Sequence, residues 1–600
     1  MLAATLLVVA ATVASVACAD VWWESAVVYQ IYPRSFKDSD GDGIGDLNGI
    51  KEKLPYLQTL GVDAIWLSPI YKSPMVDFGY DITDYKSIDP IFGTMSDFRA
   101  LMQEAKSRGI RVVLDYVPNH TSPDSEWFQK SVRREDPYTD YYVWANGPNN
   151  SATIPPSNWI SIFSKSAWEY HPQRQQFYLH QFVIGQPDLN YRSKAVQEEM
   201  KNVLRFWLDE GVSGFRIDAV NMMYEVDPAA YGGRYPDEPP SGEPVASDDY
   251  ASLNHTFTKD QDETYSVVYD WRTVLDSYTT QNESKLMVTE AYTDLNLILR
   301  YYGNGTHEGS VPFNFEYLGK VKATSTAHDF KKIVDDWMNF MPAGRVANWV
   351  NGNHDQRRMS TRYGVKRIDA MNMLALILPG LTFTYQGEEL GMTDEVVSWA
   401  MTKDPQSCNA EDPLKYYENS RDPSRSPFHW DDSPNAGFSN ATTTWLPVAS
   451  NYKTLNLAAE MAASKSHYHF YRDVIALKHT PAIKSGKVET YAISSEVLLV
   501  TRMTSKQPGV LGLINLSPTE FKVDLSKISG VSTELTVLAS GIDCTLNKGA
   551  KVQRNNIMLS GNCAIALQSP PIPVVPAAAH RYVASLTMYS VTFFLLGYLL

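Results

Sequence analysis

The chain has 600 residues, 12% of them aromatic, and a formal net charge of −15. A chain of this length exceeds what one hydrophobic core usually holds, so it predicts one large domain with one or two smaller ones. Lysine and arginine are spread along the chain rather than clustered, which argues against the electrostatic footprint of a nucleic-acid-binding protein. No nucleic-acid partner is therefore expected.

The first residues predict a cleaved secretion signal at residues 1–19. The segment MLAATLLVVAATVASVACAD is apolar and ends in small residues, the pattern that signal peptidase cuts. A basic residue before the apolar stretch is missing, so a membrane anchor is the alternative interpretation. Passage through the secretory pathway agrees with Asn-X-Ser/Thr glycosylation motifs in loop-like sequence, at Asn149, Asn254, Asn282, Asn304 and Asn440.

Cleavage of the signal leaves three cysteines, Cys408, Cys544 and Cys563. The last two bracket a short loop in an otherwise strand-like region, as the cysteines of a small disulfide-bonded domain often do. We expect a Cys544–Cys563 disulfide and a free, buried thiol at Cys408.

Residues 569–600 predict a linker followed by a signal for a GPI lipid anchor. Proline-rich SPPIPVVP and AAAHRY precede an uncharged apolar run from Val583 to Leu600, and no basic tail follows it. A spanning helix normally has about 20 apolar residues and flanking charges, whereas an anchor signal has small residues, a spacer and a terminal tail of roughly 10–20 apolar residues. We expect attachment between Ser569 and Ala579 and a location on the extracellular face of the plasma membrane, with a transmembrane helix as the alternative.

From Val27 onward the chain alternates short buried-type strands with longer amphipathic helices. The runs 27–32, 62–69 and 110–116 are rich in β-branched and aromatic residues, and helical periodicity separates them. This βαβαβ pattern is typical of parallel strands with helical crossovers. Five more strand-like runs bring the count to eight, which predicts a TIM (β/α)₈ barrel; they lie at 213–219, 286–290, 311–316, 347–351 and 381–387.

Two breaks in this pattern divide the chain. About seventy residues rich in tyrosine, tryptophan, proline and asparagine follow the third strand, and after about residue 486 helical periodicity gives way to short alternating runs. We therefore expect the barrel at 20–120 and 190–484, an inserted subdomain at 121–189 and a C-terminal antiparallel β-domain at 485–568.

Acidic and basic side chains gather at the predicted strand ends. Arg216 and Asp218 are two residues apart on one strand and so point to the same side, where the cation favours the ionised carboxylate. Glu290 ends the next strand, and Asp355 follows a later one. Ordinary solvated loop acids are the alternative, but barrels place their chemistry at this end of the strands. Carboxylate pairs without a Ser-His pairing point to glycosyl transfer.

The strings DYVPNH, QPDLNY, GFRIDAV, VTEAY and NGNHDQ closely resemble the signature regions of the α-amylase family, glycoside hydrolase family thirteen, in its oligo-1,6-glucosidase and maltase branch. The resemblance covers nearly the whole mature chain. It implies a retaining mechanism in which Asp218 is the nucleophile, Glu290 the general acid/base and Asp355 the stabiliser of the distorted ring. It further implies contacts from Arg216 to the nucleophile and from His120 and His354 to the hydroxyls of the terminal glucose.

The same resemblance implies an enzyme that trims chain ends. Asp77 and Tyr80 match the family positions that grip the non-reducing glucose, and Arg425 matches the arginine that pairs with that aspartate; a structural surface ion pair is the alternative. Within the branch a small residue directly after the nucleophile goes with α-1,4 bonds, and here that residue is Ala219. The expected substrates are maltose, sucrose and short maltodextrins.

The segment DSDGDGIGDLNG places acidic residues at alternating positions, much like the start of an EF-hand loop. Gly49 stands where an EF-hand needs its bidentate glutamate, so a true EF-hand is rejected. The branch that the chain resembles binds one structural Ca²⁺ through this loop, with an acidic loop that holds no metal as the alternative. The expected ligands are Asp38, Asp40, Asp42, the Ile44 carbonyl and Asp46.

Three other roles stay open. Amino-acid transporter heavy chains resemble this fold without being enzymes, although this chain keeps all three carboxylates. The chain also looks like the dipteran gut maltases, some anchored members of which are receptors for a bacterial binary toxin. Transglycosylation that makes isomers of sucrose is the third, and a homodimer is a further open partner.

Overall fold

The computed structural model describes residues 21–280, 283–409 and 413–571. The expected signal peptide, Asn282 and all but the first residues of the expected anchor signal lie outside the described residues. Among the helices of the described ranges, none combines the length and the apolar character that crossing a bilayer requires.

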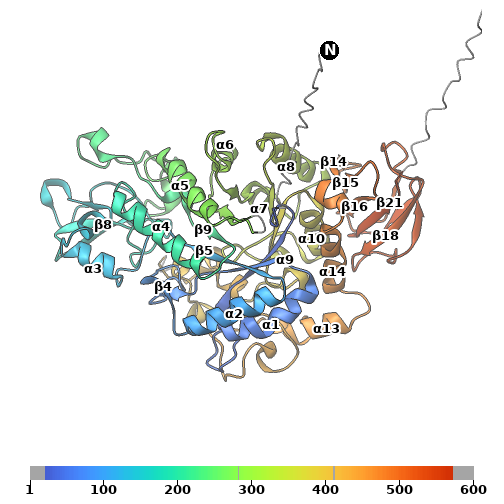
Figure 1. Ribbon diagram of the computed structural model, residues 1–600, viewed down its shortest axis with the longest axis horizontal. Coiled ribbons are helices and arrows are strands. Elements are labelled where there is room, and N and C mark those ends of the chain that lie inside the picture. The colour runs from blue at the N-terminus through green and yellow to red at the C-terminus, as the bar shows by residue number, and fades with distance from the viewer. Residues whose placement is uncertain (1–20, 281–282, 410–412, 572–600) are drawn as a thin grey trace, which may run out of the picture.

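The centre of the molecule is a sheet of eight parallel strands that curves into a nearly closed barrel (Figure 1). Its order is β11-β10-β9-β5-β2-β1-β13-β12. The two edge strands, β11 and β12, do not pair with each other, and the barrel is open between them. The eight predicted strands are thereby confirmed. They span Val27–Ile31 (β1), Ala64–Leu67 (β2), Arg111–Tyr116 (β5), Gly214–Ile217 (β9), Leu286–Thr289 (β10), Val311–Pro312 (β11), Asn348–Val350 (β12) and Leu381–Tyr385 (β13).

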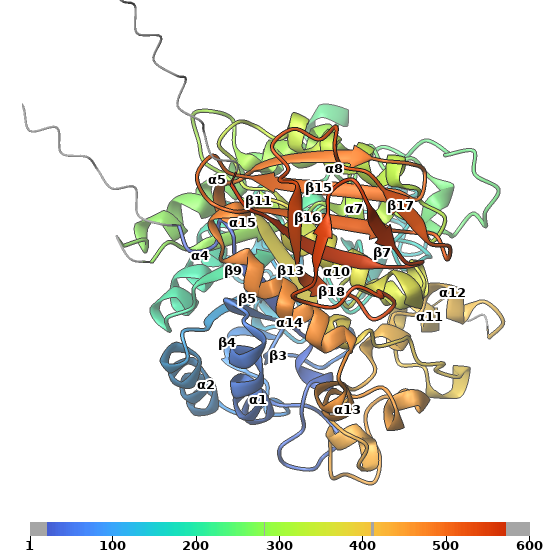
Figure 2. The same ribbon diagram turned by 90° about the vertical axis from the view of Figure 1, so that its right-hand side faces the viewer.

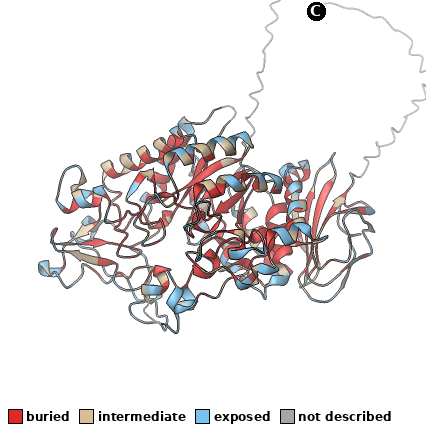
Figure 3. Cartoon of the chain, turned by 90° about the horizontal axis from the view of Figure 1, so that it is seen from below, coloured by how far each residue is buried: buried red, intermediate tan, exposed pale blue. Residues whose placement is uncertain are grey.

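Amphipathic helices cover the outer face of the barrel and strand side chains fill its interior, so the central strands are buried, as their red colour in Figure 3 shows. The first predicted helix is confirmed: Asp46 caps its amino end, Ile50, Leu54 and Leu57 are buried, and Gly61 ends it in the left-handed conformation. The longer helices span Leu47–Leu60 (α1), Met95–Ser107 (α2), Lys194–Asp209 (α4), Glu263–Ser277 (α5), Ala327–Phe340 (α8), Ile368–Ile377 (α10) and His467–Lys478 (α14).

An excursion between β5 and α4 forms the inserted subdomain, at the left of Figure 1. Its sheet has the order β6-β8-β7, with β6 at Trp144–Ala145, β7 at Trp168–His171 and β8 at Gln176–Leu179. A small aromatic core includes Trp159 and Phe177, and a later segment packs against it through Tyr235 and Phe257. Two parts of the chain far apart in sequence thus build one wall beside the barrel.

The C-terminal part is a β-domain that faces the viewer in Figure 2. A six-stranded antiparallel sheet has the order β14-β15-β16-β21-β18-β19, and β17 (Phe521–Val523) pairs with β20 (Ile557–Leu559). The sheet strands span Lys487–Ala492 (β14), Val497–Met503 (β15), Gly509–Asn515 (β16), Glu534–Ser540 (β18), Lys551–Gln553 (β19) and Ala564–Ser569 (β21).

The expected disulfide is present and joins Cys544 to Cys563. Cys408 is free, as expected, but the prediction that it is buried is wrong: it is exposed. It lies on the short helix α11 (Pro405–Asn409), which buries Pro405 and Ser407 and turns the following residue outward. Four of the five expected glycosylation asparagines are described and all four are exposed: Asn149, Asn254, Asn304 and Asn440.

Candidate active site

One buried guanidinium organises the carboxylates at the strand ends. Arg216 Nη1 lies 2.7 Å from Asp115 and 2.5 Å from Asp218, while Nη2 lies 2.5 Å from Glu290. The side chain of Arg216 is only 1% exposed. Three acidic groups from three neighbouring strands therefore share a single positive charge away from water.

Strand register explains how these groups meet. In the parallel ladders Arg216 of β9 stands opposite Asp115 of β5 on one side and Val288 of β10 on the other. The strands approach closely at Gly214, where a side-chain carbon would lie 2.2 Å from the carbonyl oxygen of Leu286. Only glycine fits there, and its presence lets β9 and β10 align so that Glu290 follows directly beside Arg216.

The chain turns sharply after Asp218. Ala219 has a left-handed backbone with φ 42° and ψ 38°, a conformation that costs a non-glycine residue about 1–3 kcal/mol. The turn directs the Ala219 amide N–H toward Glu290, to which it donates at 3.1 Å, and the next amide, that of Val220, donates to the Glu290 backbone carbonyl at 3.0 Å. The strained turn thus locks the two catalytic candidates together, and a larger side chain at this position would enter the pocket, whose wall Ala219 forms.

Burial and mutual repulsion keep a proton on this cluster. Burial raises the pKa of Glu290 to about 8, and the negative charges of Asp218 and Asp355 add to the shift while Arg216 opposes it. Burial also raises the pKa of Asp218 to about 7, with the same arginine opposing. Because the two carboxyl groups share one cation, they titrate as a pair, and the first proton resides on Glu290, whose pKa is the higher.

Asp355 is in the opposite state. Burial alone would raise its pKa, but Arg425 at 2.9 Å and Arg421 at 3.3 Å hold the pKa of this carboxyl well below its usual range. His354 contributes no charge to this effect, because burial lowers the pKa of its ring well below the ordinary value. Asp355 is therefore an anion at neutral pH. It lies across the pocket from Asp218 and Glu290, which retain one proton between them.

The sugar contact expected from His354 stays a prediction, and the structure shows which protein groups its ring contacts. Its ring Nε2 contacts the Tyr80 hydroxyl at 2.7 Å and its Nδ1 contacts the Gln30 amide at 2.8 Å, so both nitrogens face protein groups. Tyr80 stacks on the ring, and Tyr80 lines the pocket whereas His354 does not. His354 orients Tyr80, whose hydroxyl also donates to Asp115 at 3.0 Å. His120 does line the pocket, as expected.

The expected pairing of Arg425 with Asp77 is wrong. Arg421 contacts Asp77 at 2.7 Å and Asp404 at 2.6 Å, whereas Arg425 reaches Asp355 and donates to the His354 carbonyl at 2.9 Å. Both arginines belong to SRDPSRSPFHW, where the 3₁₀ turn Asp422–Arg425 (η11) sends them to neighbouring acids. The match to the motif could not tell which of the two arginines, four positions apart, pairs with Asp77.

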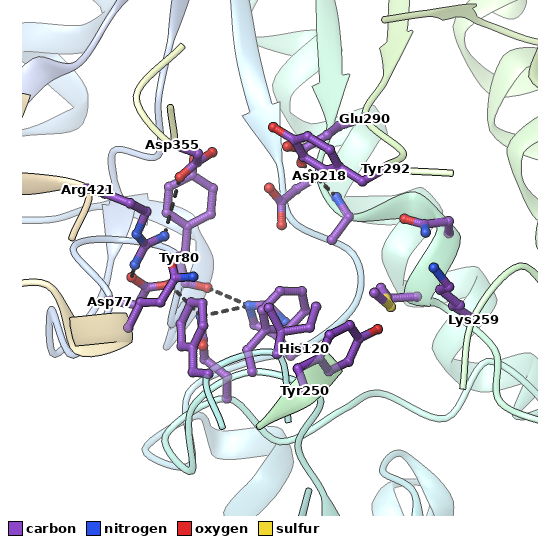
Figure 4. A pocket seen from close by; sticks show the side chains of 18 of the residues that line it. Asp77, Tyr80, His120, Asp218, Tyr250, Lys259, Glu290, Tyr292, Asp355 and Arg421 are labelled. Atoms are coloured by element: carbon purple, nitrogen blue, oxygen red, sulfur yellow. Dashed lines mark hydrogen bonds and ion pairs between the residues drawn. The ribbon is translucent and has the colours of Figure 1, made fainter. Parts of the chain in front are cut away.

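These groups enclose a pocket of about 340 Å³, in the range of small-molecule sites (Figure 4). Asp77, Arg421 and Asp355 lie together on one side of it, Asp218 and Glu290 at the top, and Tyr250 and Lys259 on the far side. Of the nineteen lining residues the sequence identified seven, Asp77, Tyr80, His120, Asp218, Ala219, Glu290 and Asp355. It did not single out Asp115 as the second partner of Arg216, although that residue opens the DYVPNH motif, nor Tyr250, Lys259 and Arg421.

The acidic loop brings three of its carboxylates together. Oxygens of Asp38, Asp40 and Asp42 lie within 4.8 Å of one another, and carboxylate oxygens are the ligands that Ca²⁺ prefers. Asp46 lies outside this group: its oxygens accept from Ser39 N at 2.7 Å and from Gly49 N at 2.8 Å, which caps α1. The Ile44 amide donates to Asp42 at 2.7 Å. The donor set fits a hard cation.

The site holds a pair of carboxyl groups, one protonated and one ionised, and a third carboxyl group that is ionised. This set lies at the mouth of a (β/α)₈ barrel, an arrangement that defines a glycoside hydrolase. Comparison with known proteins agrees. A model of the alpha-amylase catalytic domain matches residues 30–486.

Relatives match along most of the chain. Maltase A1 of Drosophila melanogaster is 48% identical over 530 residues, 87% of this chain and 92% of that protein. Salivary alpha-glucosidase of Aedes aegypti is 45% identical over 553 residues, 91% of this chain and 95% of that protein. The crystal structure of the alpha-glucosyl transfer enzyme XgtA has a TM-score of 0.79 at 34% identity and covers 92% of this chain and 99% of that one. The chain belongs to the alpha-amylase family.

The state of Glu290 predicts the alkaline side of the pH profile. If Glu290 is the general acid, activity requires its protonated form, and burial raises the pKa of Glu290 to about 8. We expect kcat/KM to rise with pH as Asp218 ionises near its pKa of about 7, to reach a maximum between about pH 7 and 8, and to fall about tenfold for each further pH unit well above 8. Initial rates on an α-glucoside from pH 6 to 10 check this, with unfolding followed in parallel by circular dichroism. A rate that stays flat to pH 10 in folded enzyme contradicts the assignment.

Proposed function

We propose that this protein is a retaining, exo-acting α-glucosidase, a maltase that releases glucose from the non-reducing ends of maltose, sucrose and short maltodextrins. The observation that carries the proposal is the sharing of one guanidinium by Asp218 and Glu290, each 2.5 Å from Arg216. Carboxyl groups about 5–5.5 Å apart act with retention, while inverting pairs stand about 6.5–9.5 Å apart to admit a water between them. Asp218 and Glu290 also share a side-chain hydrogen bond with each other, which supports the closer class.

The reaction runs in two steps. The Asp218 carboxylate attacks the anomeric carbon as the bond to the leaving oxygen breaks, and Glu290 gives that oxygen its proton. A glycosyl–enzyme ester and the free leaving sugar result. Glu290, now ionised, takes a proton from water as the water attacks the anomeric carbon, which releases glucose and regenerates Asp218. Asp355, kept ionised by two arginines, stabilises the positive charge that develops on the ring in both steps.

Closure of the pocket behind one sugar supports the exo mode of action. The Arg421–Asp77 ion pair is almost fully buried, with side chains 9% and 5% exposed, and Asp404 fixes the same arginine from behind. A chain that continued past the terminal glucose would collide with this pair. The names of the relatives, a maltase and a salivary alpha-glucosidase, point to the same substrate class. The small side chain of Ala219 favours α-1,4 bonds.

Replacing the nucleophile tests the proposal directly. The ectodomain from residue 20 to about 569 should release glucose rapidly from maltose, and Asp218→Asn, which is nearly isosteric, should lower kcat by about 10⁴-fold or more without unfolding the protein. Glucose release from maltose, isomaltose and sucrose, with the anomer followed by polarimetry, measures activity, linkage preference and retention together. The new sugars made at high substrate concentration separate hydrolysis from glucosyl transfer.

The result has three informative alternatives. Inverted product contradicts the retaining mechanism, faster cleavage of isomaltose contradicts the assigned linkage, and no cleavage of any of the three sugars moves the assignment to a non-catalytic cell-surface role. Full activity in Asp218→Asn would contradict the nucleophile.

The acidic loop is the proposed site of one structural Ca²⁺, with Asp38, Asp40 and Asp42 as carboxylate ligands and the Ile44 carbonyl and Asp46 as the further ligands that the sequence predicts. The ion would offset the repulsion of three carboxylates within 4.8 Å and so stabilise the loop that leads into α1. A cation present at about 100 times its Kd adds about 2.7 kcal/mol to the free energy of unfolding.

Chelation therefore should lower Tm by several degrees and leave the kcat of the folded enzyme nearly unchanged. Differential scanning calorimetry with and without EGTA measures this. As a control, a double variant Asp40→Asn/Asp42→Asn should have a lowered Tm that no longer responds to the chelator. An unchanged Tm of the unmodified protein in EGTA would remove calcium from the account.

The protein is further proposed to be secreted and held at the cell surface by a GPI anchor. The apolar start of the sequence, its small-residue cleavage pattern and the terminal apolar run support this, as does the salivary relative. Treatment of intact expressing cells with phosphatidylinositol-specific phospholipase C should release most of the enzyme into the medium. Release by detergent alone would favour a transmembrane segment instead.

A further inference from the structure

A long segment, residues 223–262, forms one wall of the pocket, and the catalytic carboxylates are not part of that wall. It runs between η4 (Val220–Met222) and α5 and contributes two lining residues, Tyr250 and Lys259. Figure 4 shows both on the side of the pocket away from Arg421 and Asp77. The segment packs on the inserted subdomain, where Pro236 accepts a hydrogen bond from Trp159 Nε1 at 2.8 Å.

A buried carboxylate fixes the end of this segment. Glu238, 2% exposed, accepts hydrogen bonds from the amides of Thr256 and Phe257 at 2.9 and 2.8 Å. The hydroxyls of Thr256 and Thr258 add two more, each at 3.1 Å. Four bonds to one carboxylate hold the residues directly before Lys259 in a single backbone conformation. The lysine is therefore presented to the pocket from a rigid support.

Both side chains carry donors that the protein leaves free. The Tyr250 hydroxyl is buried and has no hydrogen-bond partner among the described residues. Its ring is held by stacking on His255, with centroids 3.6 Å apart and planes inclined by 6°. Burial raises the pKa of Tyr250 well above its ordinary value, so this hydroxyl stays neutral and able to donate. Lys259 forms no ion pair within 4.0 Å with any carboxylate of the described chain.

The catalytic geometry says which part of a substrate meets these donors. The glucose that is released lies against Asp77, Arg421 and Asp355, and Glu290 protonates the oxygen that leaves. The leaving group must then extend past Glu290, away from Arg421, toward Tyr250 and Lys259. We propose that these two residues form the binding site of the leaving sugar, with the hydroxyl and the ammonium donating to its ring hydroxyls. This inference rests on the proposed α-glucosidase function.

The site would favour leaving groups that are sugars over those that carry no hydroxyls. A hydrogen bond from a charged donor contributes about 1.5–3 kcal/mol, or roughly a tenfold to hundredfold change in rate constant. By microscopic reversibility the same residues would bind a sugar acceptor when the glucosyl–enzyme transfers to glucose rather than to water.

Two variants and two substrates test the proposal. Lys259→Met keeps most of the side-chain volume without the charge, and Tyr250→Phe removes one hydroxyl. Arg234→Met, at an exposed cation of the same segment that does not line the pocket, is the matched control. Maltose has a sugar as leaving group, whereas 4-nitrophenyl α-glucoside presents the same glucose with an aryl leaving group.

We expect Lys259→Met to lower kcat/KM for maltose about tenfold or more, Tyr250→Phe about three- to tenfold, and each to lower that for the aryl glucoside much less. Starting from the aryl glucoside, both variants should also lower transfer to added glucose, relative to hydrolysis, by similar factors. That ratio compares two fates of one intermediate and does not depend on how much enzyme is folded.

Equal losses on both substrates, no loss on maltose, or an unchanged transfer ratio would overturn the proposal while leaving the α-glucosidase assignment intact. Unmodified enzyme that cleaves neither substrate would overturn the proposed function and this inference with it.

Discussion

The buried guanidinium of Arg216 is the constraint on which the catalytic site depends. It binds Asp115, Asp218 and Glu290 at once, and a single positive charge cannot balance three negative ones in a region of low dielectric. The cluster therefore retains a proton, and Glu290 holds it. Glu290, the proposed general acid, is protonated at neutral pH because burial raises its pKa and the neighbouring negative charges add to the shift. Asp115 does not line the pocket; it fixes the guanidinium and accepts a hydrogen bond from the Tyr80 hydroxyl.

Across the pocket the balance of charge is reversed. Arg421 and Arg425 both reach Asp355, and Arg421 also holds Asp77 and Asp404. Two cations hold the pKa of Asp355 well below its usual range, so this carboxylate is ionised at neutral pH. One side of the pocket thus supplies a proton and a nucleophile, and the other supplies a fixed negative charge that suits a positively charged sugar ring. Neither half requires a conformational change to reach its state of ionisation.

The barrel and its insertions have separate tasks. The parallel strands carry the reacting carboxylates, whose positions follow from ladder register and from the close approach at Gly214. The walls come from longer connections: the inserted subdomain after β5, the segment 223–262 after β9 and the residues around Arg421 after β13. Such connections can differ between related barrels without disturbing the strands. The same barrel fold can therefore accept substrates with different leaving groups. The rigidity of the 223–262 wall comes from Glu238 rather than from regular secondary structure.

The sequence by itself determined the eight strands, the first barrel helices, the disulfide and which acids stand at the strand ends. These features follow from periodicity and from short motifs, because residues close together in the sequence determine them. Only the tertiary structure decided that Arg421 and not Arg425 meets Asp77, that His354 faces Tyr80 and Gln30, and that Cys408 is exposed.

It likewise decided that Tyr250 and Lys259, some thirty residues or more after the nucleophile, stand across the pocket from Arg421. Each of these outcomes depends on where a loop without periodicity returns to the barrel, and on the pairing of charges that are distant in sequence. Ionisation has the same origin, because the pKa of Glu290 is set by burial and by three charges that no local pattern of residues brings together.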